Sequence, residues 1–203
     1  MKVMAKWNQV TVGLTLLIAA LTLWRWFYSG DASLKCVISS VDGERYCVRE
    51  RQHLDKAADL LATTSQHMSK VVDYCQQNYP DDEAVQRMVS RYDPIQIKET
   101  LPTSEFTAYS ENKGQKMALC VNKKRDGTKL IDQNTLTFVA LHELAHIMSV
   151  SIGHTKEFWK NFKFLIDRGV ETGVYVPVDY SKTPTEYCGM DLTSNPYYSN
   201  FEH

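Results

Sequence analysis

Residues 135–150 read TLTFVALHELAHIMSV, and the fold is built around this stretch. It is almost entirely apolar, and only three of its side chains can ionise. These are His142, Glu143 and His146, and every other residue in the run is apolar, or small and uncharged. A helix that is apolar on nearly every face is predicted to be buried. Burying titratable groups is unfavourable unless they are paired or bind a metal ion. The sequence therefore predicts a buried helix that carries a functional set of side chains.

The spacing of the two histidines indicates a metal site. His142 and His146 are four residues apart, so both imidazoles lie on one helix face and can reach one ion. Glu143 lies one position round, beside the open coordination position where a water needs a general base. The alternative is a buried helix whose histidines only hydrogen-bond to backbone carbonyls, and the apolar helical context disfavours it.

A third metal ligand is expected just beyond this helix. Gly153 permits the left-handed turn that reverses the chain, and His154 follows it directly. An ordinary loop histidine is the alternative interpretation of His154. In that case a carboxylate, from Glu157 or Glu171, is the third ligand instead.

The string HELAHIMSVSIGHTKEFWKNF resembles the zincin metallopeptidases of the WLM and SprT-like group. It looks especially like small metallopeptidases encoded by large nucleocytoplasmic DNA viruses, as do LIDQNTLTFVALHELAH and the later segment PTEYCGMDLTSNP. The resemblance implies that His142, His146 and His154 bind Zn²⁺ and that Glu143 is the general base. Seven residues separate His146 from His154, more than in the metzincin pattern, which argues against that subgroup.

Together these features predict a membrane-anchored zinc metallopeptidase that hydrolyses a peptide or protein substrate, and the viral resemblance implies that it is virion- or virus-associated. Zinc lowers the pKa of a water and Glu143 removes its proton. Tyr187 is a candidate stabiliser of the oxyanion, and a core or surface tyrosine is the alternative. Two other functions remain open. One is a catalytically weak zincin-fold structural protein of a virion membrane, in contact with other membrane or capsid proteins. The other is an amide hydrolase with a different substrate, such as peptidoglycan.

The N-terminal residues predict a membrane anchor. Residues 10–24, VTVGLTLLIAALTLW, carry no charge, and residues 7–28 are long enough to cross ~30 Å of hydrocarbon at ~1.5 Å per residue. A cleaved signal peptide is the alternative, but the bulky WRWFY follows the apolar run and only residues 30–32 suit a cleavage site. We therefore divide the chain into an anchor, 1–30, and a zincin-like domain, 31–203. The positive charges favour an N-terminus inside a single-pass protein of the virion or a virus-modified host membrane.

Composition and charge set further bounds. The 203 residues are 43% hydrophobic and carry a net charge of -1, which suits one domain with a real core. No nucleic-acid partner is expected, because the only compact basic cluster is Lys123-Lys124-Arg125. Among five cysteines, Cys36 and Cys47 flank a predicted hairpin and are a candidate disulfide, with two free buried thiols as the alternative.

The order of predicted elements favours an α+β fold with a small sheet beside the motif helix. A long helix is expected at about 52–78, a shorter one up to about residue 92, and strands at 106–109 and 117–121. An aromatic helix capped by Thr155 follows the motif and is expected to pack on it. We expect the strand at 116–121 to form a sheet edge that accepts an extended peptide.

Overall fold

The chain folds as five helices and seven short strands in a computed structural model that describes residues 2–28, 34–94, 97–111, 114, 116–125 and 129–198. The helices are α1 (Lys2–Tyr28), α2 (Leu54–Asn78), α3 (Glu83–Arg91), α4 (Gln133–Met148) and α5 (Lys156–Glu171). The strands are β1 (Leu34–Ile38), β2 (Arg45–Arg49), β3 (Ile97–Glu99), β4 (Ala108–Glu111), β5 (Lys116–Leu119), β6 (Thr185–Tyr187) and β7 (Met190–Leu192). The predicted α+β class is confirmed.

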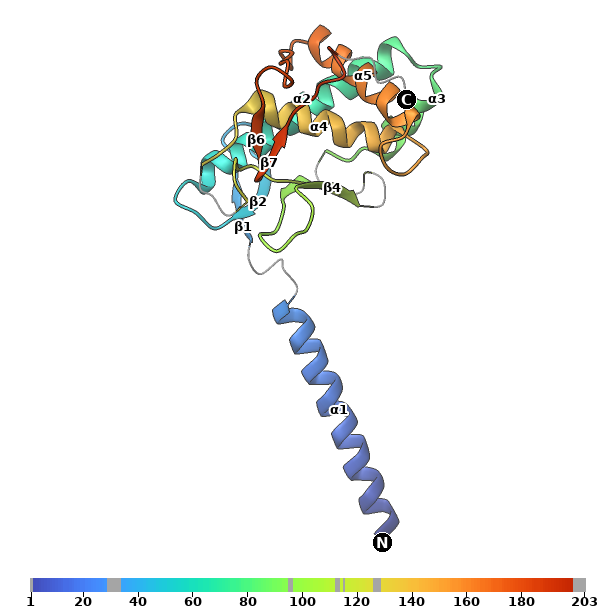
Figure 1. The fold of residues 1–203 in the computed structure, drawn as a ribbon. Coiled ribbons are helices and arrows are strands. Elements are labelled where there is room, and N and C mark those ends of the chain that lie inside the picture. The colour runs from blue at the N-terminus through green and yellow to red at the C-terminus, as the bar shows by residue number, and fades with distance from the viewer. Residues whose placement is uncertain are drawn as a thin grey trace.

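Helix α4 lies at the centre of the core. It begins at the N-cap Asp132, whose carboxylate accepts from the backbone nitrogen of Thr135, and twelve of its sixteen side chains are buried. Helices α2, α3 and α5 pack on it, and β4 lies beneath it in Figure 1. Helix α5 has Thr155 as its N-cap, as predicted. The motif helix is therefore buried because it has neighbours on nearly every side.

The three-stranded sheet beside α4 has the order β3-β5-β4. Strand β5 is parallel to β3 and antiparallel to β4, so both of its edges are paired. The prediction that residues 116–121 form a free sheet edge is therefore wrong. Within the part of the chain that the structure describes, β4 is the edge strand on the side that contacts α4. Sequence pattern alone does not give the order of strands in a sheet.

Two hairpins complete the fold, and a disulfide holds each of them. In the β1–β2 hairpin Cys36 lies directly opposite Cys47, and the two sulfurs are bonded. The β6–β7 hairpin is fastened to the end of β5 by a disulfide between Cys120 and Cys188. Cys75 is buried and free. The second disulfide links segments 68 residues apart, and no spacing in the sequence indicates it.

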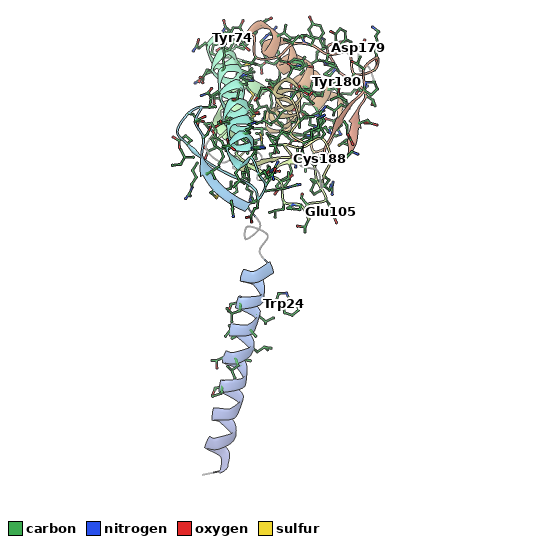
Figure 2. The ribbon with its side chains drawn as sticks, turned by 90° about the vertical axis from the view of Figure 1, so that its left-hand side faces the viewer. Trp24, Tyr74, Glu105, Asp179, Tyr180 and Cys188 are labelled. Atoms are coloured by element: carbon green, nitrogen blue, oxygen red, sulfur yellow. A yellow bond between two sulfur atoms is a disulfide. The ribbon has the colours of Figure 1, made fainter. Side chains whose placement is uncertain are left out.

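The N-terminal helix α1 extends away from the other elements (Figure 1), and Trp24 on it lies apart from their side chains (Figure 2). No helix in the described part of the chain is long and apolar enough to cross a membrane. The predicted transmembrane helix, and with it the single-pass membrane location with its N-terminus inside, is therefore wrong. Residues 7–28 are long enough, but Asn8, Gln9 and Arg25 interrupt their apolar sequence, and polar or charged groups are costly in hydrocarbon. The candidate cleavage site at 30–32 lies outside the described residues.

Candidate metal centre and cleft

Three histidines converge at one point beside α4. The Nε2 atom of His142 lies 3.2 Å from Nε2 of His146 and 3.1 Å from Nε2 of His154. His142 and His146 come from successive turns of α4, and His154 comes from the loop between α4 and α5. Gly153 has a φ of +82°, so glycine permits the left-handed conformation that precedes His154. The structure thus brings together the three predicted ligands.

The donor set fits a zinc ion. Three imidazole nitrogens on a tetrahedral Zn²⁺, each at ~2.0–2.1 Å, are separated from one another by roughly 3.3 Å. The two separations of 3.1 and 3.2 Å are close to that value. In addition, burial lowers the pKa of His142 to about 3, with smaller contributions from the charges of His146 and His154. A neutral imidazole offers the lone pair that metal binding requires.

Phe158 on α5 holds the histidine rings in place. Its ring centroid lies 4.8 Å from that of His142, 4.3 Å from that of His146 and 4.7 Å from that of His154. The ring of Phe158 is fully buried and is stacked on His146. One aromatic side chain therefore contacts all three candidate ligands. The sequence predicts that this aromatic helix packs on the motif helix, but it does not indicate the role of Phe158 at the histidines.

Glu157 and Glu171, the alternative third ligands, do not join the histidines in the structure. Glu157 accepts hydrogen bonds from the backbone nitrogens of Val150 and Ser151, at 2.8 and 2.9 Å. These bonds, the Val150 bond first, lower the pKa of Glu157 to about 2. Glu171 instead accepts hydrogen bonds from Arg168 and from the hydroxyl of Tyr74. Glu157 therefore holds the loop that carries His154, and Glu171 belongs to the far end of α5.

Glu143 is buried beside the histidines and faces the same cleft. Glu143 is only 6% exposed, and burial raises the pKa of its carboxyl to about 8. A buried carboxylate is a stronger base than an exposed one, because burial disfavours its charged form. Its position next to His142 on α4 matches the place expected for a general base.

The histidines and Glu143 line a cleft with a volume of about 680 Å³. The cleft is bounded by α4, by β4 and the residues that lead into it, by the loop before α5, and by the β6–β7 hairpin. Its lining residues are Phe106, Thr107, Ala108, Tyr109, Ser110, Phe138, Val139, His142, Glu143, His146, Ser151, Ile152, Gly153, His154, Tyr187, Met190 and Leu192. The edge strand β4 therefore runs along the cleft in which the histidines lie.

Tyr187, the predicted oxyanion stabiliser, is a buried lining residue of this cleft. Its phenol donates to the carbonyl of Thr107 at 3.3 Å. Burial, and next the negative charge of Glu143, raise the pKa of Tyr187, so the phenol keeps its proton. The neighbouring Cys188 (Figure 2) forms a disulfide with Cys120 and has a φ of +51°. The disulfide fixes the turn between β6 and β7, and with it the position of Tyr187.

Proteins from three viruses are similar to this chain. An uncharacterized protein of Acanthamoeba polyphaga mimivirus is 28% identical over 187 residues, which is 89% of this chain and 94% of that protein. An uncharacterized protein of Invertebrate iridescent virus 6 is 39% identical over 69 residues, covering 34% of this chain and 38% of its own length. An uncharacterized protein of Invertebrate iridescent virus 3 is 42% identical over 59 residues, which is 29% of this chain and 36% of that protein.

These similarities support a family of viral proteins, and they name no activity. No family model matches the chain, and no solved structure matches it. The resemblance to zincin metallopeptidases therefore rests on the motif, and the function has to be argued from the geometry of the cleft.

Proposed function

We propose that this chain is a zinc-dependent peptidase that hydrolyses peptide bonds in the cleft beside α4. The observation that carries the proposal is the convergence of three imidazoles: Nε2 of His142 lies 3.2 Å from that of His146 and 3.1 Å from that of His154, and the carboxyl of Glu143 is buried beside them. Three protein ligands are typical of catalytic zinc sites, which keep the fourth position for water or substrate. A structural zinc has four protein ligands and needs no adjacent carboxylate.

The chemistry follows from the side chains around that point. Zinc, when bound by His142, His146 and His154, supplies a Lewis acid that polarises a carbonyl and acidifies a water. Glu143 removes the proton of the attacking water and delivers it to the leaving amine nitrogen. Burial suits Glu143 to this role, because a carboxylate held away from water is a stronger base than an exposed one.

Strand β4 suits the binding of an extended peptide. Among the described strands it pairs only with β5, so the outer backbone groups of residues 108–110 are available on the side of the cleft. An extended segment that adds to this edge forms main-chain hydrogen bonds and passes the histidines. The proposed substrate is therefore a peptide or an extended segment of a protein, and not a nucleic acid.

The decisive experiment uses the purified 203-residue chain, loaded with zinc, and a mixture of unstructured peptides. We expect one zinc per chain by elemental analysis and cleavage products by mass spectrometry. The matched variant Glu143→Gln should keep its zinc, while its cleavage rate falls by about a hundredfold or more because the water loses its base. Bound zinc without cleavage by the unmodified chain would contradict the peptidase and favour a structural role.

A further inference from the structure

The cleft is apolar on both sides of the histidines. Phe138 and Val139 lie one turn before His142 on α4, so they are on the same side of the helix as this candidate ligand. Leu192 lies on β7 and Tyr187 on β6, and they line the same cleft. An apolar surface therefore begins directly beside the candidate metal ligands and is formed by α4 and the β6–β7 hairpin.

The rim of the cleft is also apolar, although it is open to solvent. Phe106 is 65% exposed, Ile152 is 89% exposed and Met190 is 48% exposed. They come from the segment before β4, the loop before α5 and the start of β7, respectively. Exposed apolar groups that gather around a concave site mark a binding surface more often than single exposed residues do.

Charged side chains are scarce in this cleft. Among its described lining residues, Glu143 is the only carboxylate, and there is no lysine or arginine. Away from Glu143 and the histidines, a charged substrate side chain that entered the cleft would lose water without finding an opposite charge, which is unfavourable. An apolar side chain would instead gain from leaving water. The lining therefore favours apolar substrate side chains over charged ones.

We propose that the cleft selects an extended peptide segment with a bulky apolar side chain, such as Leu or Phe, next to the bond at the histidines. The inference rests on the proposed function and specifies its substrate class. Strand β4 supplies the backbone contacts, which are the same for every sequence. Phe138, Val139, Met190 and Leu192 supply the selectivity, because they line the space beside the histidines. We expect a preference of at least about tenfold for the apolar side chain.

The test measures binding as well as turnover. The zinc-loaded Glu143→Gln chain is titrated with fluorescent peptides of one length that differ at a single position, which carries Leu, Phe, Gly, Asp or Lys. That position is moved along the peptide, and the dissociation constant is measured by fluorescence polarisation. The same peptides are then given to the unmodified chain, and kcat/KM is measured. We expect one position at which Leu and Phe bind about tenfold more tightly than Gly and Asp.

Two matched variants link this preference to the cleft. Met190→Glu places a carboxylate at the rim, on a side chain exposed enough to tolerate the change, and should lower the Leu-over-Lys preference at least about threefold. Val176→Glu makes the same change at a residue that is 69% exposed and lies outside the cleft lining, and should leave the preference unchanged. Met190→Leu keeps an apolar side chain at the rim and should retain the Leu-over-Lys preference of the unmodified chain.

Each outcome decides between the two proposals. Selective binding without cleavage by the unmodified chain would keep the substrate class and overturn the peptidase. Cleavage with equal kcat/KM for Leu, Gly and Asp peptides at every position would keep the peptidase and overturn the substrate class. The absence of peptide binding at millimolar concentration, or a preference that survives Met190→Glu unchanged, would also overturn it.

Discussion

The carboxylate of Glu157 accepts hydrogen bonds from both the backbone nitrogen and the hydroxyl of Ser151, at 2.9 and 2.7 Å. Ser151 lies three residues before His154, in the loop that joins α4 to α5. The hydroxyl of Ser151 also lies 2.6 Å from that of Thr155, the N-cap of α5. These contacts tie the loop to the first turn of α5, so they fix the backbone from which His154 reaches the other two histidines.

Replacing Glu157 should therefore weaken metal binding although Glu157 is no ligand. We expect Glu157→Gln to raise the dissociation constant for zinc about tenfold, as residues that support metal ligands do. Glu171→Gln is the matched control, because Glu171 lies about 21 Å further along α5 at ~1.5 Å per residue and pairs with Arg168. Competition with a chelator measures both variants. Equal affinities for the two variants would contradict the assigned role of Glu157.

The low pKa of Glu157 also predicts how loop stability depends on pH. The pKa falls from an ordinary 4.5 to about 2 on folding, chiefly because the Val150 backbone N–H donates to the carboxylate. A group whose pKa is lowered on folding stabilises the folded state fully above its unfolded pKa, and this contribution is lost as the pH falls toward the folded value. The window is therefore from about 4.5 down to about 2.

Urea unfolding of metal-free protein measures this effect. The difference in unfolding free energy between the unmodified chain and Glu157→Gln should be constant from pH 7 to pH 5 and should shrink between about pH 4.5 and pH 2.5. Histidine protonation is common to both proteins and cancels in the difference. A difference that stays constant down to pH 2.5 would show that the carboxylate is not held by the backbone of the loop.

Most of the helical framework follows from local sequence signals. The apolar run around His142 predicts a buried helix, and α4 is buried because α2, α3 and α5 surround it. Thr155 predicts the start of α5, since its hydroxyl accepts from the backbone nitrogen of Phe158. The histidine spacing of four residues predicts a shared helix face, which is where the two rings lie. Each of these features depends on residues close together in the chain.

The features that sequence reasoning missed depend on residues far apart in the chain. The edge position of β4 depends on β3 pairing with the other side of β5, and no local pattern indicates that order. The bond between Cys120 and Cys188 depends on the β6–β7 hairpin returning to the end of β5. The error at residues 7–28 is of another kind, because the length of the segment was given more weight than the polar residues within it.

The two disulfides should differ in their effect on the cleft. Cys120–Cys188 closes a loop of 68 residues and holds the hairpin that carries Tyr187 and Met190, whereas Cys36–Cys47 closes a loop of 11 residues outside the cleft lining. Loop entropy predicts a loss of about 4 kcal/mol of stability without the first disulfide and about 3 kcal/mol without the second. Only the loss of Cys120–Cys188 should also make the β6–β7 side of the cleft more mobile.

Paired alanine variants separate stability from the cleft. The Cys120→Ala/Cys188→Ala protein should bind peptides more weakly and show faster amide hydrogen exchange in the β6–β7 hairpin, while its zinc content is unchanged. The Cys36→Ala/Cys47→Ala protein should lose stability with no change in peptide binding at a temperature where both proteins are folded. Equal peptide affinities for the two double variants would show that the hairpin does not shape the cleft.

His154 is the candidate ligand that comes from a loop and not from α4, and its replacement tests the proposed metal centre most directly. Its Nε2 atom reaches to 3.1 Å from that of His142 although the two residues are twelve positions apart. Removing this imidazole leaves the two ligands of α4, and a site with two protein ligands holds zinc far less tightly than one with three. We expect His154→Ala to lower zinc affinity by at least about a hundredfold and to abolish the thermal stabilisation that zinc provides.

His53→Ala is the matched control, because His53 is exposed at the start of α2 and lies outside the histidine cluster. It should bind zinc as the unmodified chain does, measured by chelator competition and by the zinc-dependent rise in Tm. If His154→Ala bound zinc as tightly as His53→Ala, the third ligand would have to come from another residue. Glu157 would then be the nearest carboxylate along the chain, and binding by it would require the loop to give up its bonds from Val150 and Ser151. That rearrangement has its own test: if Glu157 were the third ligand in the His154→Ala protein, adding Glu157→Gln to that protein would remove the remaining zinc.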